Sequence, residues 1–372
     1  MRKTFYKVFI LLLIIALGQC SDKHHGQKTN WPCFKGDNLR TSAASDPGPG
    51  KAPEIAWLCN LQMKITSSPV IYDYCLYCGA DSGLIAINIK NDETLWFFKT
   101  DGKVFSTPAA DRNSIFFGSW DKNFYALDRL TGNRLWSFSD TGAFSSSPLI
   151  DGDLVYVGNY GGQVYAFNKH DGKTAWSYKA NHWVVSSPAV LGEKLFIGSS
   201  DSYLYCLNKN TGELIWKYKT AKDIASTPAI SVVDSAVFIG SHDGIMYCFD
   251  ICSGAEIWRF ETNNMIFASP AIYNDRIFFG SLDSTLYCLD SKSGQELWRF
   301  PTYGEIYGSP VVASDMVYFI SYDSELYTLN AANGALEHNI FIHDISYTTP
   351  AISGRLLFFG DDSGKIYVVG KR

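Results

Sequence analysis

Two residues recur along this chain at a constant distance from each other. At seven places a tryptophan lies 12 residues before a proline that follows Ser or Thr, and at the eighth place His338 stands where the tryptophan is expected. Successive prolines are 39 to 42 residues apart. A register kept over so many copies indicates one structural unit repeated along the chain. The tryptophans are Trp57, Trp96, Trp136, Trp176, Trp216, Trp258 and Trp298, and the prolines are Pro69, Pro108, Pro148, Pro188, Pro228, Pro270, Pro310 and Pro350.

Each repeat has the pattern of four short strands joined by turns. In the copy from Ser186 to Thr220, runs of apolar and aromatic residues alternate with clusters of Gly, Ser, Asn and Asp, as strands alternate with turns. No window shows a sustained helical period. Four strands in about 40 residues, repeated eight times, predict an all-β fold, an eight-bladed β-propeller of four-stranded blades.

The last blade is incomplete in the chain that follows Pro350. Three strand-like runs follow this proline, and the fourth strand, which carries the tryptophan in other copies, is missing. Residues 54–60 contain such a strand, with Trp57, but have no blade of their own. We therefore expect strand 54–60 to complete the last blade, so that no sheet edge stays open. Residues 31–372 are predicted to form one closed propeller, and we expect it to be a monomer.

The first 30 residues are predicted to be a leader and a tether. A basic start and an apolar run from Val8 to Leu17 are typical of a signal peptide over residues 1–19. Leu17-Gly18-Gln19-Cys20 is similar to a bacterial lipobox, which makes Cys20 the expected lipidation site, whereas Ala16-Leu17-Gly18 also suits an ordinary signal peptidase. Residues 20–30 are polar and form the expected tether. We expect an exported protein of the periplasm or outer membrane, associated with the membrane through a lipid anchor.

The charge of the chain argues against one class of partner. The formal net charge is −5, and Arg2, Lys3 and Lys7 all lie in the predicted leader. An acidic body lacks the clustered basic surface that nucleic acids require, so no nucleic-acid partner is expected. In an oxidising compartment Cys33 and Cys59 are candidates for a disulfide, and the sequence does not decide whether they pair.

Two stretches of the repeat resemble a known family. Ala126-Leu-Asp-Arg-Leu-Thr-Gly-Asn-Arg-Leu-Trp136 and the corresponding stretch from Ala166 to Trp176 are similar to the tryptophan-docking motif of propellers of the pyrroloquinoline-quinone (PQQ)-like type. The resemblance implies that the seven repeat tryptophans are docking residues, whose indoles stack on the backbone of the next blade. The segment from Trp31 to Thr41 resembles the short stretch of chain found in front of many such propellers.

The family contains periplasmic quinoprotein dehydrogenases and a non-catalytic lipoprotein of outer-membrane assembly. The dehydrogenases are longer and hold PQQ with a calcium ion, and many have a disulfide between adjacent cysteines, a pair that this chain lacks. The turn acids, such as Asp121 and Asp201, recur once per repeat and are interpreted as turn residues. We expect a non-catalytic envelope scaffold that binds a protein or peptide and has no cofactor. The alternatives are a PQQ-dependent oxidoreductase and a protein that binds carbohydrate or another surface ligand.

One set of positions varies in a way that the repeat does not explain. The residue three places before each repeat proline leads into the innermost strand, so these residues are predicted to ring one mouth of the channel. Phe267, Tyr307 and Tyr347 are aromatic there in three consecutive blades, while other blades have small residues. A contiguous apolar patch of this kind suggests recognition, although the side chains also suit a plug of the channel. The predicted partner-binding face is formed by Phe105, Trp183, Met265, Phe267, Tyr307 and Tyr347.

Overall fold

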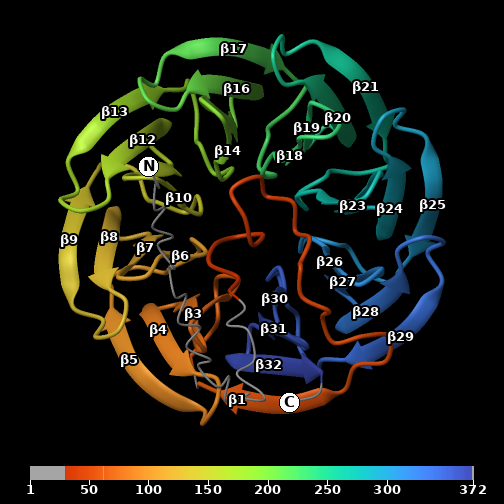
Figure 1. Ribbon diagram of the computed structural model, residues 1–372, viewed down its shortest axis with the longest axis horizontal. Coiled ribbons are helices and arrows are strands. Elements are labelled where there is room, and N and C mark those ends of the chain that lie inside the picture. The colour runs from red at the N-terminus through yellow and green to blue at the C-terminus, as the bar shows by residue number, and fades with distance from the viewer. Residues whose placement is uncertain (1–29, 62, 371–372) are drawn as a thin grey trace, which may run out of the picture.

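The computed structural model describes residues 30–61 and 63–370, and all 32 of their regular elements are strands. The strands form eight antiparallel sheets of four strands each, arranged as blades around a central channel (Figure 1). The eight-bladed propeller predicted from the repeat is therefore confirmed. The predicted signal peptide, and Cys20 with nearly all of the predicted tether, lie outside the described residues. Within these residues no helix has the length and hydropathy needed to cross a membrane.

Seven blades are continuous in the chain, and each runs from its innermost to its outermost strand. The first four are β2 Val70–Tyr72, β3 Cys75–Ala80, β4 Gly83–Asn88 and β5 Glu93–Lys99; β6 Ala109–Ala110, β7 Ser114–Gly118, β8 Asn123–Asp128 and β9 Arg134–Ser139; β10 Leu149–Asp151, β11 Leu154–Gly158, β12 Gln163–Asn168 and β13 Thr174–Lys179; and β14 Ala189–Leu191, β15 Lys194–Gly198, β16 Tyr203–Asn208 and β17 Leu214–Lys219. The next three are β18 Ala229–Ser231, β19 Ala236–Gly240, β20 Ile245–Asp250 and β21 Glu256–Glu261; β22 Ala271–Tyr273, β23 Arg276–Ser281, β24 Thr285–Asp290 and β25 Glu296–Pro301; and β26 Val311–Ala313, β27 Met316–Ser321, β28 Glu325–Asn330 and β29 Leu336–Phe341.

The eighth blade joins the two ends of the propeller, which confirms the prediction that an N-terminal strand completes it. It consists of β30 Ala351–Ser353, β31 Leu356–Gly360, β32 Lys365–Gly370 and the N-terminal β1 Ile55–Asn60. β1 pairs antiparallel with β32, from Ile55 opposite Val369 to Asn60 opposite Lys365. This pairing closes the ring, because each of the eight sheets then has its four strands.

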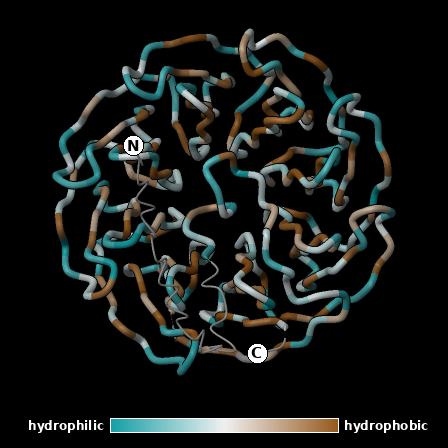
Figure 2. Tube along the Cα trace, viewed as in Figure 1, coloured by the Kyte–Doolittle hydropathy of each residue, from teal (hydrophilic) through white to brown (hydrophobic). Residues whose placement is uncertain are grey.

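The packing of the blades explains the hydrophobic pattern of the strands. In β16 the four residues from Leu204 to Leu207 are all buried, because the blade is covered on both faces by its neighbours. The outermost strand β17 alternates exposed and half-buried residues over most of its length. Figure 2 shows both hydrophobic and hydrophilic stretches along the rim of the ring.

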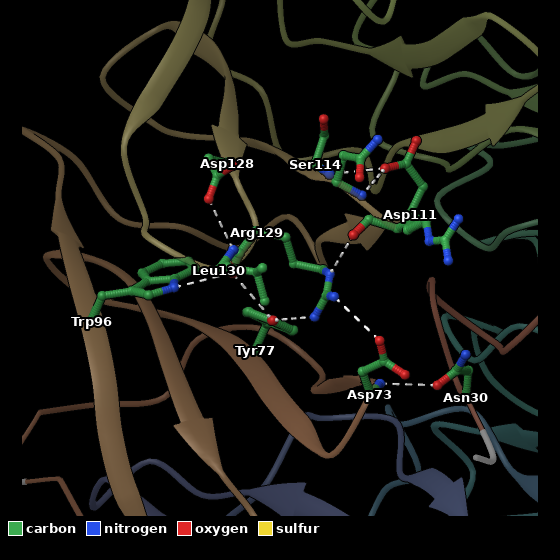
Figure 3. Close-up of polar contacts among 11 residues, drawn as sticks. Asn30, Asp73, Tyr77, Trp96, Asp111, Ser114, Asp128, Arg129 and Leu130 are labelled. Atoms are coloured by element: carbon green, nitrogen blue, oxygen red, sulfur yellow. Dashed lines mark hydrogen bonds and ion pairs between the residues drawn. The ribbon is translucent and has the colours of Figure 1, made fainter. Parts of the chain in front are cut away.

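Tryptophans on the outermost strands join each blade to the next. The indole nitrogen of Trp96 donates to the carbonyl of Arg129 at 3.1 Å, as Figure 3 shows, and Trp176 donates to Lys209 at 2.7 Å. The ring lies over a turn glycine of the next blade: a Cβ on Gly212, whose φ is +76°, would come within 2.5 Å of Trp176. Such a position accepts no other residue without strain. The same bond is made by Trp136, Trp216, Trp258 and Trp298, and the side chain of Trp57 lies outside the described part of the structure.

The joint between blades 7 and 8 is built without a tryptophan. In blade 8 the strands β32 and β1 belong to opposite ends of the chain, so no turn with a glycine is present beneath His338. The hydroxyl of Tyr318 instead donates to the carbonyl of Gly50 at 3.0 Å and lies 3.1 Å from its N–H. Lys51 and Glu337 form an ion pair at 3.2 Å across the same joint. His338 therefore occupies the tryptophan position in a joint that is held by other contacts.

The segment of residues 31–48, here called the girdle, closes one end of the channel. It winds through the middle of the ring, where it is drawn in red in Figure 1, and it is hydrogen-bonded to all eight blades in chain order. The bonds pair Trp31 with Ile71, Pro32 with Ala110, Asn38 with Ile150 and Val190, Leu39 with Ile230, Thr41 with Ile272, Ser42 and Ala44 with Val312, and Gly48 with Gly354. The girdle thereby covers the inner edges of the sheets, whose N–H and C=O groups would otherwise lack partners.

Two cationic side chains extend from the girdle into the channel. Arg40 donates to the carbonyls of Pro188 at 2.9 Å and Pro148 at 3.0 Å, and Lys35 donates to the carbonyl of Pro270. Both side chains are fully buried. The backbones of Lys35 and Arg40 adopt left-handed conformations with φ of +62° and +59°, which costs free energy for residues other than glycine. The prolines of the repeat thus supply the carbonyl groups that surround both cations.

Candidate functional site at the open mouth of the channel

The opposite end of the channel is open and carries the variable positions identified in the sequence. All eight positions line one cavity of about 200 Å³ on the axis, and Phe34 of the girdle also contributes to its lining. The residue that precedes each of these eight variable positions points away from the channel and into the packed blades. Ile266, for example, is fully buried and lies against Gly240 of β19, where a Cβ would come within 2.3 Å of it. Because neighbouring residues in extended chain point to opposite sides, the position that follows is left facing the channel, and blade packing does not determine its side chain.

On one side of the mouth, four aromatic rings from three blades form a continuous row. Phe105 contacts Trp120 with ring centroids 4.9 Å apart, Trp120 contacts Tyr160 at 5.8 Å, and Tyr160 contacts Trp183 at 5.1 Å. Phe105, Trp120 and Trp183 are exposed by 36%, 45% and 48%. The structure thus brings two of the predicted face residues, Phe105 and Trp183, into one row.

A second row lies on the other side of the mouth. Phe267 contacts Tyr307 at 5.6 Å, and Tyr307 contacts Tyr347 at 5.7 Å. Tyr322 contacts Tyr307 at 5.0 Å and Tyr347 at 5.1 Å. The ring of His242 contacts that of Phe267 in a tilted arrangement, with centroids 4.0 Å apart. Burial, with a hydrogen-bond interaction with Glu305 as the second cause, raises the pKa of Tyr307 to about 12. The two rows together are called the aromatic band below.

Three members of the aromatic band were missed in the sequence, and Met265 takes no part in its ring contacts. Trp120, Tyr160 and Tyr322 occupy the turn between the second and third strands of their blades, at a position where other repeats have Ser200 or Leu282. Their variation was a usable signal, since a turn position rarely requires a large ring. Met265 is exposed by 36% and lies in the loop that leads to Phe267.

A second pocket adjoins the central cavity between blades 8, 1 and 2. It has a volume of about 370 Å³ and shares Phe105 and Tyr347 with the cavity. Lys64 and Lys103 lie at its edge. Lys64 is paired with Asp362 at 2.5 Å, and the ammonium of Lys103 lies 6.0 Å from the ring of Phe105.

Below the aromatic band, the Ser or Thr before each repeat proline contributes to a belt of hydroxyls around the channel. Seven of the eight hydroxyl oxygens accept the N–H of the equivalent residue in the preceding blade, for example Ser147 N to Ser187 Oγ at 2.9 Å. Seven such bonds link Thr107, Ser147, Ser187, Thr227, Ser269, Ser309, Thr349 and Ser68. The Ser-Pro and Thr-Pro pairs of the repeat therefore join the blades around the axis.

The recurrent turn acids hold backbone and tyrosine hydroxyls. Asp201 accepts the N–H groups of Tyr203 at 3.1 Å and Asn181 at 2.9 Å and the hydroxyl of Tyr205 at 2.7 Å. Asp283 accepts the hydroxyl of Tyr287, whose pKa is raised to about 12 by burial first and by this bond second. These contacts agree with the interpretation of the acids as turn residues.

The cysteines of the described residues are free thiols. Cys33 is buried in the girdle and Cys59 is half-buried in β1, and they form no disulfide. Burial raises the pKa of the Cys33 thiol to about 11. No three His, Cys, Asp or Glu side chains of residues 30–61 and 63–370 gather in a way that could hold a metal ion.

The central cavity does not match what PQQ with calcium requires. PQQ carries several carboxylates, and a calcium ion takes six to eight oxygen ligands, mainly carboxylates and amide carbonyls. Among the described residues, the side chains that line the cavity include no Asp, Glu, Asn, Gln, Lys or Arg. The lining therefore lacks the oxygen ligands that the calcium ion requires, and we derive no redox chemistry for this site.

Comparison with known proteins places the chain in a family. A family model described as the β-propeller of β-alanine-activating enzyme matches residues 50–276, more than half of the chain. The chain belongs to this β-propeller family. A second model, described as outer membrane protein assembly factor BamB, matches residues 242–372. The resemblance to PQQ-like propellers is confirmed.

Solved structures support the fold and do not separate the functions. BamB from Moraxella catarrhalis has a TM-score of 0.76 at 18% identity and covers 86% of this chain and 100% of its own. A europium-containing methanol dehydrogenase has a TM-score of 0.79 at 11% identity, with 92% and 98% covered. Tetrathionate hydrolase from Acidithiobacillus ferrooxidans is 35% identical over 51 residues, which are 14% of this chain and only 10% of that protein. Since an assembly factor and a dehydrogenase match almost equally well, this likeness shows the fold alone.

Proposed function

We propose that this protein is a non-catalytic scaffold of the cell envelope that holds an extended segment of a protein partner across the open mouth of its channel. The observation that carries the proposal is the aromatic band. Aromatic side chains are large and rigid, and they dominate the energetics of protein interfaces. Their rings contact one another within and between neighbouring blades and stay partly exposed, so an elongated ligand can touch several of them at once.

The asymmetry between the two ends of the channel supports this choice of face. At the closed end the girdle supplies a partner to each blade, while at the mouth the blades present side chains that their own packing does not require. A matching BamB model over residues 242–372 agrees with an assembly role in the outer membrane, which is the more specific form of the proposal.

Partner capture from cross-linked envelopes, read by mass spectrometry, tests the proposal. The double variant Tyr307→Ala, Tyr347→Ala is expected to weaken capture at least about tenfold, since interface aromatics typically contribute a few kcal/mol each. Ser145→Ala, at the equivalent place in blade 3, is the control and is expected to bind normally. Normal capture by the folded double variant would contradict the assignment of this face.

A second measurement addresses the catalytic alternative. Purified protein is expected to show no dye-linked oxidation of alcohols or sugars with added PQQ and calcium, because the described residues that line the cavity include none of the carboxylate and amide ligands of a calcium ion. Saturable turnover that requires PQQ would favour the oxidoreductase and overturn the proposal.

The envelope location is part of the proposal and follows from residues 1–30. Fractionation of cells is expected to recover the protein with the membranes, and Cys20→Ala is expected to release it as a soluble periplasmic form. A mature protein that still begins at Met1 would contradict export.

A further inference from the structure

The belt of hydroxyls still has hydrogen-bond donors to offer to the cavity. A serine or threonine hydroxyl has one proton and two acceptor lone pairs. The belt oxygens accept a backbone N–H from the neighbouring blade, as in Ser269 N to Ser309 Oγ at 2.9 Å. Within residues 63–370, none of the belt hydroxyls donates a hydrogen bond to another protein group. All belong to residues that are at least nine-tenths buried and that line the central cavity, so their protons are available to a molecule on the axis.

The layer beneath the belt carries positive charge. The carbonyls that Lys35 and Arg40 bind belong to the prolines that directly follow belt residues, and one residue of extended chain spans about 3.3 Å. A nitrogen of Arg40 also lies 3.5 Å from the carbonyl of Ser147, itself a belt residue.

Neither cation is neutralised by a carboxylate. The described residues contain no ion pair for Lys35 or Arg40, and the nearby Asp37 accepts hydrogen bonds from the backbone N–H and hydroxyl of Thr41. Buried charges are normally paired with an opposite charge, whereas the guanidinium of Arg40 lies beneath the belt with backbone carbonyl groups as its hydrogen-bond partners.

We propose that the central cavity is a binding site for a carboxylate or a small oxyanion, held by the belt hydroxyls above Lys35 and Arg40. In the scaffold, this group is an acidic residue or a chain terminus of the bound partner, and this part of the inference rests on the proposed function. The aromatic band then contacts the apolar residues on either side of the acidic group.

The donor pattern favours an anion over a sugar. A neutral sugar offers hydroxyls that both donate and accept, and it is recognised best by mixed sets that include carboxylates and amides. The side chains that line this cavity contain no carboxylate or amide. A ring of donors over buried cations is matched by a ligand that only accepts hydrogen bonds, as carboxylates and oxyanions do.

Binding of trifluoroacetate to the purified protein, followed by ¹⁹F line broadening at constant ionic strength, tests the site without any partner. We expect saturable broadening that acetate reverses, and little broadening of trifluoroethanol, a neutral molecule of similar size. Equal broadening of both probes, or reversal by glucose but not by acetate, would overturn the proposal.

Two double variants distinguish the contribution of the belt hydroxyls to binding from their contribution to packing. Ser147→Thr, Ser187→Thr keeps both hydroxyls, and threonine already occupies this place at Thr107 and Thr227. We expect it to bind trifluoroacetate within about twofold of the unmodified protein, while Ser147→Ala, Ser187→Ala loses at least about tenfold. Unchanged binding by a folded alanine variant would contradict the site. If the alanine variant does not fold, the competition between acetate and glucose on the unmodified protein decides.

A pair of peptides distinguishes a free anion from an acidic partner. The peptide acetyl-Gly-Phe-Glu-Phe-Gly-amide is expected to bind more tightly than its counterpart with Gln in place of Glu, and acetate is expected to compete with it. Binding of trifluoroacetate without any preference for the Glu peptide would refute the acidic-partner claim and leave the anion site standing. Normal partner capture by the tyrosine double variant would refute the proposed function and leave the anion result unaffected.

Discussion

The two ends of the channel are built from the same eight repeats, but one end is closed by the girdle and the other is open. At the closed end the girdle forms hydrogen bonds with every blade and places Lys35 and Arg40 among the prolyl carbonyls. At the open mouth the same innermost strands begin with side chains that vary from blade to blade, and the aromatic band remains exposed. One end therefore satisfies the requirements of folding, and the other leaves groups free for a ligand.

The difference teaches how to separate structural from functional residues in a repeat protein. A residue that recurs in nearly every blade, such as a docking tryptophan, is held by contacts between blades. Trp120 differs in size and type from the residues at the equivalent position of other blades, and no contact between blades requires this difference. Such a residue indicates a role outside the fold, for example in binding. This distinction predicts effects on stability that are largest for the docking tryptophans and smallest at the mouth of the channel.

The docking tryptophans provide the reference for a purely structural role. Trp176 is buried and donates to Lys209 of the next blade, so Trp176→Ala should lower the free energy of unfolding by about 3–5 kcal/mol. Denaturant unfolding measures the change. Trp176→Phe, which keeps much of the ring surface and removes the hydrogen bond, should lose less. A Trp176→Ala protein as stable as the unmodified one would show that the indole does not join the blades.

Arg40 tests the closed end. Its side chain is hydrogen-bonded to the carbonyls of Pro188, Pro148 and Phe34, so Arg40→Ala leaves buried acceptors without donors and opens a void. We expect a loss of about 2–4 kcal/mol in the free energy of unfolding. Arg40→Lys should recover part of it, since one ammonium cannot reproduce the planar set of donors. A neutral effect of Arg40→Ala would mean that the girdle is held by its backbone alone.

How much of this was predictable from the sequence depends on the range of the contacts. The spacing of Trp176 and Pro188 indicated the blades and the closing strand, because each repeat encodes the same local strands. The course of the girdle was not predictable, because Arg40 binds Pro148 and Pro188, more than 100 residues away, and adopts a left-handed conformation. His338 indicated an irregular joint, but the contacts of this joint were not predictable for a related reason: they come from Gly50, at the other end of the chain.

Five of the eight Phe, Tyr and Trp rings in the aromatic band were predicted from the sequence, namely Phe105, Trp183, Phe267, Tyr307 and Tyr347. The register of the repeat located Phe267, Tyr307 and Tyr347 at equivalent places. Trp120 and Tyr322 lie in turns, where neither hydrophobic period nor spacing indicates which way a side chain points.

Lys35 makes the stability of the closed end depend on pH. Burial lowers the pKa of Lys35 well below its ordinary value. Between this lowered pKa and the ordinary value of about 10.4, Lys35 is protonated in the unfolded chain and not in the folded protein. The free energy of unfolding therefore rises with pH in this range by up to about 1.4 kcal/mol per pH unit.

Lys35→Met removes the titrating group and fills a similar volume. The variant should be the more stable protein at low pH, and the difference should shrink as the pH approaches about 10. Urea unfolding of both proteins at several pH values measures this. A difference that stays constant with pH would mean that Lys35 keeps its proton in the folded protein over the whole range.

The smallest loss of stability is expected at the mouth, where Trp120 is 45% exposed and contacts Phe105 and Tyr160 of the same row. Trp120→Ala should lower the free energy of unfolding by about 1–2 kcal/mol, less than Trp176→Ala, because nearly half of the ring stays in water, and should also weaken partner capture. Leu135→Ala is the matched control: Leu135 is 52% exposed on β9 of the same blade, at the outer rim and away from the mouth. Both changes remove a partly exposed apolar side chain, so their effects on stability should be similar, and only the one at the mouth should affect capture. If Trp120→Ala destabilised the protein as much as Trp176→Ala, the aromatic band would be a plug that supports the blades, and the contrast between the two ends of the channel would no longer mark a binding site.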